Sequence, residues 1–393
     1  GSRDPTRRVK TQCQRKPNSP RTYTLNTIMS VFDVKKNPAI CVLPWVHEFK
    51  KIGGNTAPCC VGDPFLEGET IANTRESMLE GVQPRVCNRC YKTERDSGWS
   101  PRIQETKDWI AKFGEPDIEK PQLQFIDVRY DPTCNLKCKT CGPHDSTLWQ
   151  KEKGIKIPVN KANENYLNNI DKKILKKVYL AGGEPTYIKG YLVFLEELFV
   201  VNPLCEVVIN TNLKKLPEAW KEIIIKFKNL TVVCSCDAIQ TLGTYVRYPL
   251  GWTEFEENVK FVSENANFLQ FNLVAGNLTV HKLYETCTWM KQYSKHINLS
   301  ILHLPKIFSE EAVPTEHRDV YIDNVKKLLK FPVSIYYAAR FRNEVNYLIK
   351  KYSEAEYSKS LHSKLRDEIS QQDSHRSLPL VEVDSFLHSW IYT

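Results

Sequence analysis

Three cysteines lie close together in the stretch Cys134-Asn135-Leu136-Lys137-Cys138-Lys139-Thr140-Cys141. The spacing is C-x3-C-x2-C, and the stretch follows a strand-like run over residues 123–130. Three thiolates on one short loop can ligate three irons of a cubane [4Fe–4S] cluster. The fourth iron then stays open, whereas a closed four-thiolate zinc site leaves no position for chemistry. We predict that Cys134, Cys138 and Cys141 are cluster ligands; half of a zinc site, or unrelated thiols, is the alternative.

Short strand-like and helix-like runs alternate after Pro121. Strands rich in Val, Ile, Leu and Phe are predicted at residues 123–130, 177–181, 206–210, 231–236, 269–274 and 298–302. Helices are predicted between them at residues 191–200, 218–226, 254–265, 283–293 and 318–329. Such βα repeats predict an α/β fold with a parallel sheet and helices outside it. Two further helices are predicted at residues 340–352 and 361–371.

The second predicted strand ends in Gly182-Gly183-Glu184-Pro185. Two glycines allow backbone to approach a ligand closely, and a carboxylate can accept hydrogen bonds from an ammonium group. An ordinary loop is the alternative for such a turn. A strand followed by this turn, after the three-cysteine loop, is the context that favours a binding site.

The C-x3-C-x2-C loop and the Gly-Gly-Glu-Pro turn resemble those of the radical S-adenosylmethionine (SAM) superfamily. The resemblance implies a partial (β/α)6 TIM-like barrel over residues 119–335. The apolar run at residues 386–391 is expected to dock on this barrel. It implies a [4Fe–4S] cluster whose open iron is chelated by the amino and carboxylate groups of SAM. One electron then yields a 5′-deoxyadenosyl radical, which abstracts hydrogen from a substrate. The chain departs from the family at Thr140, where an aromatic residue is usual.

The same resemblance implies which residues contact SAM. Gly182, Gly183 and Glu184 are expected to bind its amino group, and Arg247 its carboxylate. The remaining candidates are polar residues at the ends of later strands, expected near the ribose, the carboxylate, the adenosyl group or the substrate: Asn212, Ser235, Asp237 and Asn277. Helix capping is the alternative for polar residues at strand ends, and a structural ion pair is the alternative for Arg247.

Five further cysteines lie before the predicted barrel, in residues 38–118. Cys41 precedes a predicted strand at 46–52 and a predicted turn at 53–55. The pattern Gly54-x4-Cys59 follows, with Cys60 directly after it. A helix is then predicted at 71–80, and Cys87-x2-Cys90 comes after this helix. This pattern resembles the SPASM/twitch module, which holds an auxiliary iron–sulfur cluster. The resemblance implies Cys41, Cys59, Cys87 and Cys90 as ligands, with Cys60 as a substitute for Cys59. A structural zinc site is the alternative.

Composition limits the classes of protein to consider. Thirteen clustered cysteines favour metal ligation in a reducing cytoplasm over disulfides. The sequence has no apolar run long enough for a transmembrane helix. Residues 1–37 carry a net charge of +7 of the total of +9, and they are expected to form a disordered basic tail. The opening Gly1-Ser2 is expected to be foreign to the native chain, with Met29 as a candidate start.

The predicted function is radical SAM chemistry on a peptide or protein, with an electron donor such as flavodoxin or ferredoxin as partner. The peptide assignment rests on the SPASM/twitch resemblance, since fold alone does not define a substrate. Modification of a nucleic acid or nucleoside is one alternative, favoured by the basic tail. A non-enzymatic, zinc-stabilised interaction protein is the other. Residues 336–393 are expected to form a helical extension in which no chemistry is legible.

Overall fold

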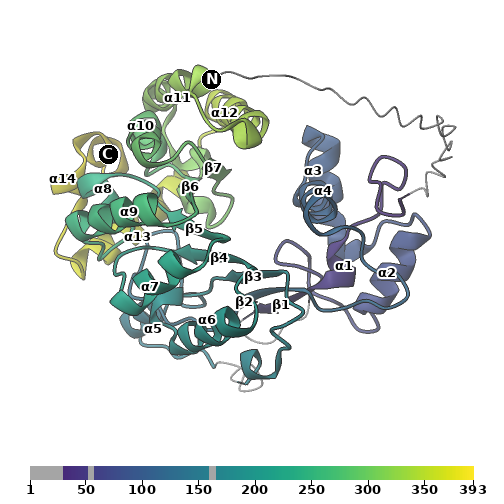
Figure 1. Cartoon of the computed structure of the whole chain (residues 1–393). Helices are drawn as coiled ribbons and strands as arrows, with labels where there is room; N and C mark the ends of the chain where they lie inside the picture. Colours follow the sequence, from purple (N-terminus) through teal and green to yellow (C-terminus); the bar gives the residue numbers. More distant parts are fainter. Residues whose placement is uncertain (1–29, 52–56, 159–164) are drawn as a thin grey trace, which may run out of the picture.

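The computed structural model describes residues 30–51, 57–158 and 165–393. Its centre is a parallel sheet in which the strands follow one another in sequence order (Figure 1). The strands are β1 (His47–Lys51), β2 (Phe125–Arg129), β3 (Lys177–Leu180), β4 (Glu206–Thr211), β5 (Leu230–Ser235), β6 (Phe268–Ala275) and β7 (Ile297–Ile301). The α/β fold predicted from the sequence is confirmed, and all six predicted barrel strands are present.

The sheet contains one strand more than the six predicted repeats supply. β1 comes from the cysteine-rich N-terminal segment and pairs in parallel with β2, from His47 opposite Phe125 to Lys51 opposite Arg129. Residue 52 and the turn predicted at 53–55 lie outside the described residues, as does most of the predicted basic tail. The N-terminal segment therefore extends the sheet rather than only packing against it.

Helices cover one face of the sheet because alternate side chains of each strand are apolar and point to that face. Ile126 and Val128 of β2 belong to the same buried cluster as Tyr191, Phe194 and Leu195 of α6. The helices that follow the strands are α5 (Thr147–Lys153), α6 (Lys189–Val201), α7 (Glu218–Lys226), α8 (Gln240–Val246), α9 (Trp252–Asn265), α10 (Leu283–Tyr293) and α11 (Arg318–Lys326). The five helices predicted between strands are thus confirmed.

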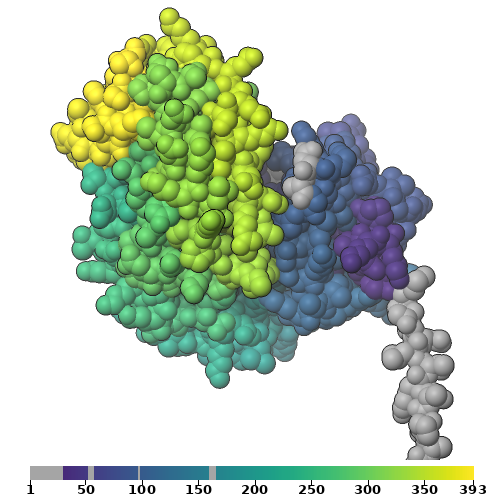
Figure 2. Space-filling view, turned by 90° about the horizontal axis from the view of Figure 1, so that it is seen from above, coloured from purple at the N-terminus to yellow at the C-terminus, as the bar shows by residue number. Residues whose placement is uncertain are grey.

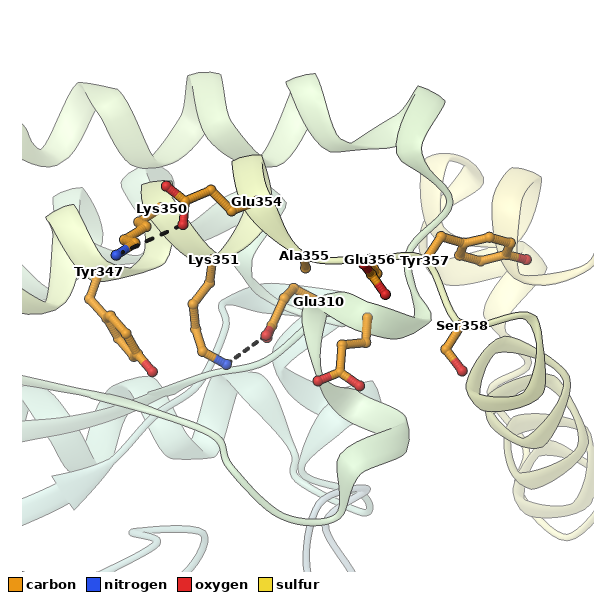
Figure 3. A pocket seen from close by; sticks show the side chains of 10 residues that line it. Glu310, Tyr347, Lys350, Lys351, Glu354, Ala355, Glu356, Tyr357 and Ser358 are labelled. Atoms are coloured by element: carbon orange, nitrogen blue, oxygen red, sulfur yellow. Dashed lines mark hydrogen bonds and ion pairs between the residues drawn. The ribbon is translucent and has the colours of Figure 1, made fainter.

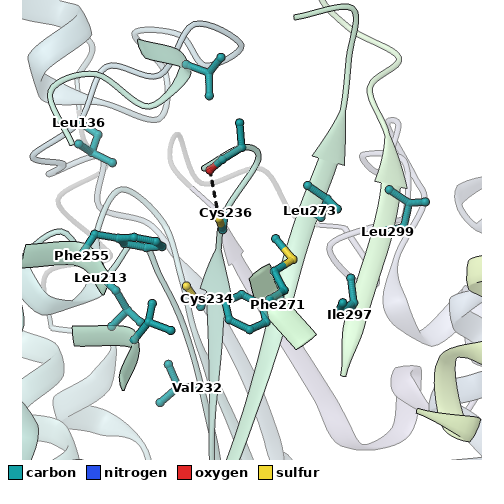
Figure 4. Close-up of a cluster of buried hydrophobic side chains, with 14 of the residues drawn as sticks. Leu136, Leu213, Val232, Cys234, Cys236, Phe255, Phe271, Leu273, Ile297 and Leu299 are labelled. Carbon is teal, nitrogen blue, oxygen red and sulfur yellow. Dashed lines mark hydrogen bonds between the residues drawn. The ribbon is translucent and has the colours of Figure 1, made fainter. Parts of the chain in front are cut away.

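Four cysteines outside the two predicted ligand groups lie in this buried core. Cys205, Cys234, Cys236 and Cys287 are all almost completely buried. Cys234 on β5 and Cys236 just after this strand lie among Phe255 and Phe271, and Leu136 of the three-cysteine loop reaches the same cluster (Figure 4). These thiols serve as small apolar side chains.

Polar side chains line the opposite face of the sheet. Asp127 and Arg129 of β2 alternate with the apolar residues, and Asn272 of β6 lies opposite both Ser235 and Asn298 in the register of its neighbours. Parallel strands covered on both faces are usually apolar throughout. A polar inner face therefore indicates a surface kept for a ligand.

The N-terminal segment has a second, smaller core. It contains Trp45, Met78, Tyr91 and Trp109, together with Phe125 of β2. Its helices are α1 (Leu43–Val46), α2 (Ile71–Leu79), α3 (Asn88–Ser97) and α4 (Pro101–Phe113). Because Phe125 belongs to the sheet, this core is continuous with the inner face of β2.

The C-terminal extension meets both ends of the sheet. It consists of α12 (Ile335–Glu354), α13 (Lys359–Ser374), α14 (Leu380–Val383) and α15 (Ser385–Ile391). At the start of α12 the Tyr336 hydroxyl contacts Asp108 and accepts a hydrogen bond from Gln104 of α4 at 3.1 Å, and Figure 2 shows the two segments side by side. The helices predicted at 340–352 and 361–371 are confirmed as parts of α12 and α13.

The last helix docks on the barrel as predicted. Leu387, Trp390 and Ile391 of α15 are fully buried in the main core. Asp384 caps α15, and its carboxylate Oδ2 lies 2.9 Å from Nε2 of His281. The C-terminal helices are therefore integral to the folded unit.

Replacing Trp390 with Ala should lower the free energy of unfolding by about 3–5 kcal/mol, because a large buried ring leaves a cavity. Urea denaturation followed by circular dichroism measures this change. The control is Tyr392→Ala, since Tyr392 lies two residues away at the surface. A loss below about 1 kcal/mol for Trp390→Ala would show that α15 does not support the core.

Candidate functional site

The three-cysteine loop leaves the carboxyl end of β2 and runs to α5. Its buried backbone is hydrogen-bonded to the segment after α8: the amide of Lys137 donates to Tyr248 O at 2.7 Å, and that of Lys139 donates to Val246 O at 2.8 Å. The indole of Trp149 on α5 donates to Cys138 O at 2.9 Å. Backbone groups that have hydrogen-bond partners hold a loop in one conformation. The backbone that carries the three thiols is therefore fixed in place.

The three thiols lie near one another. Burial and, next, the neighbouring Cys138 thiol raise the pKa of Cys134 to about 12. Burial likewise raises the pKa of Cys141, with added contributions from Cys138 and Cys134. A metal would reverse this preference, because a coordinating thiol is deprotonated. In the metal-free chain the loop therefore holds a compact group of thiols in their neutral form.

The Gly-Gly-Glu-Pro turn braces the start of this loop. The amide of Gly183 donates to Asp131 O at 2.9 Å, and that of Glu184 donates to Thr133 O at 2.7 Å. A Cβ on Gly183 would stand 2.2 Å from Thr133 O, and Gly182 has a positive φ of 120°. The close approach that requires both glycines is thus to the residues just before Cys134.

Glu184 is buried, and its carboxylate is fully occupied by the chain itself. One oxygen accepts from the Thr186 amide and hydroxyl and from the Thr211 hydroxyl, at 3.2, 2.8 and 2.5 Å. The other accepts from the Asn212 amide at 2.7 Å. Burial raises the pKa of Glu184, and these hydrogen bonds oppose that rise. The carboxylate joins the ends of β3 and β4; its predicted contact with the SAM amino group stays a prediction.

Three other predicted residues lie beside the loop. The Asn212 side-chain amide donates to Asn135 Oδ1 at 2.8 Å and reaches Cys134 Sγ at 3.9 Å. Arg247 pairs with Asp237 at 2.8 Å, and the Cys138 thiolate would raise the pKa of its guanidinium. Among the described residues, Arg247 Nε is a buried donor that has no hydrogen-bond partner. A cation with a spare donor beside the thiols suits an anionic ligand.

Ser235 and Asn277 are the two predicted residues whose side-chain hydrogen bonds are made to segments other than the cysteine loop. Ser235 donates to Asn210 Oδ1 on the inner face at 3.1 Å. The Asn277 amide donates to Ile307 O and Ser309 O at 2.9 Å, so it ties the loop after β6 to the segment after β7. Asn277 is completely buried, and its Oδ1 lacks a partner among the described residues. Their roles toward a cofactor stay predictions.

Sequence reasoning missed the polar inner face. Asp127 binds Arg129 through two hydrogen bonds of 2.7 and 2.9 Å, and Asn272 accepts from Asn298 at 2.9 Å. The signal in the sequence is the presence of polar residues at alternate positions of β2 (Asp127 and Arg129) and β6 (Gln270 and Asn272). This signal does not reveal an inner face by itself, because a single strand does not tell which face is enclosed.

The N-terminal cysteines form a second group of thiols. Burial raises the pKa of Cys41, and the thiols of Cys87 and Cys90 raise it further. Burial also raises the pKa of Cys59, with contributions from the adjacent Cys60 and from Cys41 and Cys90. Cys41, Cys59, Cys87 and Cys90 are therefore mutual neighbours, although they come from separate parts of the N-terminal segment.

Cys60 has different surroundings from Cys59. Desolvation by the surrounding protein raises its pKa to about 12, and the next contribution comes from Asp127 on the inner face of β2. It is the exposed cysteine of the pair. Of the two residues left open by the sequence, Cys59 is the one that lies with the other N-terminal thiols.

Across the described ranges, no three His, Cys, Asp or Glu side chains converge on a position for a single metal ion. An open cavity of about 620 Å³ lies elsewhere, between α12 and the segment after β7, where Lys351 pairs with Glu310 at 2.6 Å (Figure 3). It shares no lining residue with either thiol group. None of the described helices combines the length and apolar character that crossing a bilayer requires.

No family model matches the chain. A curated relative, the GTP 3′,8-cyclase of Mannheimia succiniciproducens, is 26% identical over 126 residues, which span 30% of this chain and 35% of the cyclase. Among solved structures, Streptococcus suis SuiB bound to S-adenosylmethionine is 14% identical, with a TM-score of 0.37 over 68% of this chain and 55% of SuiB. The enzyme anSMEcpe with bound AdoMet is 16% identical, with a TM-score of 0.40 over 53% of this chain and 57% of that one.

Both of these solved structures hold bound S-adenosylmethionine (AdoMet). Because the chain spans only about a third of the length of the curated relative, its activity and substrate are matters for proposal.

Replacing Gly183 with Ala should displace the start of the cysteine loop, because the added methyl group would collide with Thr133 O. We expect a loss of about 2–4 kcal/mol in the free energy of unfolding, measured by urea denaturation. Gly190→Ala is the matched control: nothing lies within 4 Å of its added Cβ, and a Gly to Ala change within a helix is neutral or stabilising by up to about 1 kcal/mol. Equal stabilities of the two variants would contradict the role given to the turn.

Proposed function

We propose that this chain is a radical SAM enzyme in which Cys134, Cys138 and Cys141 hold three irons of a [4Fe–4S] cluster. The observation that carries the proposal is the loop itself: three neighbouring thiols, on a hydrogen-bonded frame, at the carboxyl end of a parallel strand. Ligands of α/β barrels gather at that end of the strands. When bound, the cluster supplies the electron that cleaves SAM to methionine and a 5′-deoxyadenosyl radical.

The chain's own residues position the reactants. Gly182 and Gly183 bring the turn against the loop, and Glu184 fixes the ends of β3 and β4 in front of it. The buried guanidinium of Arg247, with its free Nε, is placed to bind a carboxylate such as that of SAM. The cluster fits this donor set because three thiols leave an open iron for a second ligand.

A peptide or protein is the substrate class that we propose. The inner face of the sheet presents side-chain amides, including Asn210, Asn272 and Asn298, which can donate to and accept from peptide groups. The SPASM/twitch-like cysteine pattern supports the same class by analogy. A flavodoxin or ferredoxin in the cytoplasm would supply the electron.

A nucleotide is the second candidate substrate, because the sequence match covers part of an enzyme named for GTP. The two classes are separated by adding GTP or a peptide mixture to the reconstituted protein with SAM and dithionite. The substrate class that accelerates 5′-deoxyadenosine formation is the one that the site accepts.

Replacing Cys134, Cys138 and Cys141 together with Ala should abolish 5′-deoxyadenosine formation under dithionite, because no thiolate would remain to hold the cluster. The product is measured by liquid chromatography after anaerobic reconstitution. Cys287→Ala serves as control, since this thiol is buried away from the loop. Product formation at the wild-type rate in the triple variant would refute the proposal.

The N-terminal thiols are proposed to hold a second iron–sulfur cluster. In the triple variant, about four irons per chain should remain if that site is a cubane, or about two if it is a [2Fe–2S] centre. Cys59→Ala in this background should release the iron, whereas Cys60→Ala should retain it, because only Cys59 lies with the other three thiols. One zinc and no iron in the triple variant would favour the structural alternative.

A further inference from the structure

The side of the cysteine loop that faces away from the thiols is anchored by the C-terminal helix α13. Lys139, between Cys138 and Cys141, has a fully buried side chain whose ammonium pairs with Asp373 at 2.6 Å. The same ammonium lies 3.8 Å from the centre of the Tyr245 ring. Asp373 also accepts from the Tyr245 hydroxyl at 3.0 Å and from the Leu380 amide at 2.8 Å. The Asp373 carboxylate thus binds Lys139 of the loop together with Tyr245 and Leu380, which come from other segments.

A second buried ion pair joins the same two segments. Arg376, just beyond α13, pairs with Glu152 of α5 at 3.3 Å, and its side chain is 1% exposed. Glu152 pairs in turn with Lys137 of the loop. The Arg376 guanidinium lies 5.0 Å from the Trp149 ring and 5.4 Å from the Tyr248 ring, and both residues bind the loop backbone. Two loop lysines, on either side of Cys138, are therefore linked to the end of α13 and the residues just after it, Lys139 directly and Lys137 through Glu152.

Buried charges are costly to desolvate, and removing one partner of such a pair leaves the other uncompensated. Loss of Asp373 would therefore leave the buried ammonium of Lys139 without its carboxylate partner inside the loop. An exposed pair on the same helix, Glu368 with Lys153 at 3.8 Å, lacks this property because water screens both charges. Variants that break the buried Asp373–Lys139 pair can therefore be compared with variants that break the Glu368–Lys153 pair, and the difference between them measures the role of the buried pair.

We propose that Asp373 and Arg376 are positioning residues of the cysteine loop: through Lys139 and Glu152 they fix the conformation in which the three thiols lie together. The consequence for SAM cleavage rests on the proposed function, whereas the effect on the loop does not. In this proposal the C-terminal extension stabilises the conformation of the cysteine loop and does not itself contact the reacting atoms.

The test is alkylation of the metal-free, full-length chain by iodoacetamide, with the rate at each cysteine followed by mass spectrometry. In Asp373→Asn we expect the rates at Cys134, Cys138 and Cys141 to rise about tenfold, because the loop opens locally when Lys139 loses its partner. The rates at Cys41, Cys87 and Cys90 should not change. Glu368→Gln is the control and should leave all rates at their wild-type values.

A second readout uses the reconstituted protein. Asp373→Asn should change the electron paramagnetic resonance spectrum of the SAM-bound, reduced loop cluster and slow 5′-deoxyadenosine formation about tenfold. Asp373→Glu, which keeps the charge, should restore both in part. If wild-type protein cleaves no SAM, the proposed function fails, and the alkylation rates still decide the role of α13.

Two results would overturn the inference. Loop rates within about twofold of wild type in Asp373→Asn would show that the ion pair does not hold the loop, and an equal rise at all cysteines would show general loss of structure. If Asp373→Asn does not fold by circular dichroism, Lys139→Met takes its place. That variant removes the same pair from the loop side and leaves Asp373 its contacts with Tyr245 and Leu380.

Discussion

The hydrogen bonding of the buried loop between β2 and α5 is the constraint on which the rest of the site depends. The three-cysteine loop forms neither helix nor strand, so its backbone groups need partners elsewhere. They find them in the last residue of α8 and the segment after it, in Trp149 of α5, and in the turn after β3. These hydrogen bonds hold the loop against the barrel.

This arrangement explains why the Gly-Gly-Glu-Pro turn contains two glycines. Gly183 lies so close to Thr133 that no side chain fits between them. Glu184 joins two strand ends with hydrogen bonds to both of its oxygens. The turn thus supports the cysteine loop whatever it contributes to binding SAM, because its contacts are made within the chain.

The two groups of thiols sit in different electrostatic settings. Beside the loop thiols lies Arg247 with an unpaired donor, and behind them are two lysines neutralised by Asp373 and Glu152. The N-terminal thiols lie in the smaller core with Arg102, which pairs with Glu94. Each site therefore has a nearby cation that is already paired with a carboxylate, and at the loop site one donor of that cation, Arg247 Nε, has no partner among the described residues.

The sequence alone determined the strands, most helices and the thiol pattern, because apolar periodicity and close cysteine spacing are local properties of the chain. Only the tertiary structure decided that β1 joins the sheet, that Cys59 rather than Cys60 lies with Cys41, and that Asp373 reaches Lys139. These contacts join residues far apart in the chain, and their partners are chosen by packing and by the need to neutralise buried charge, which no local pattern records.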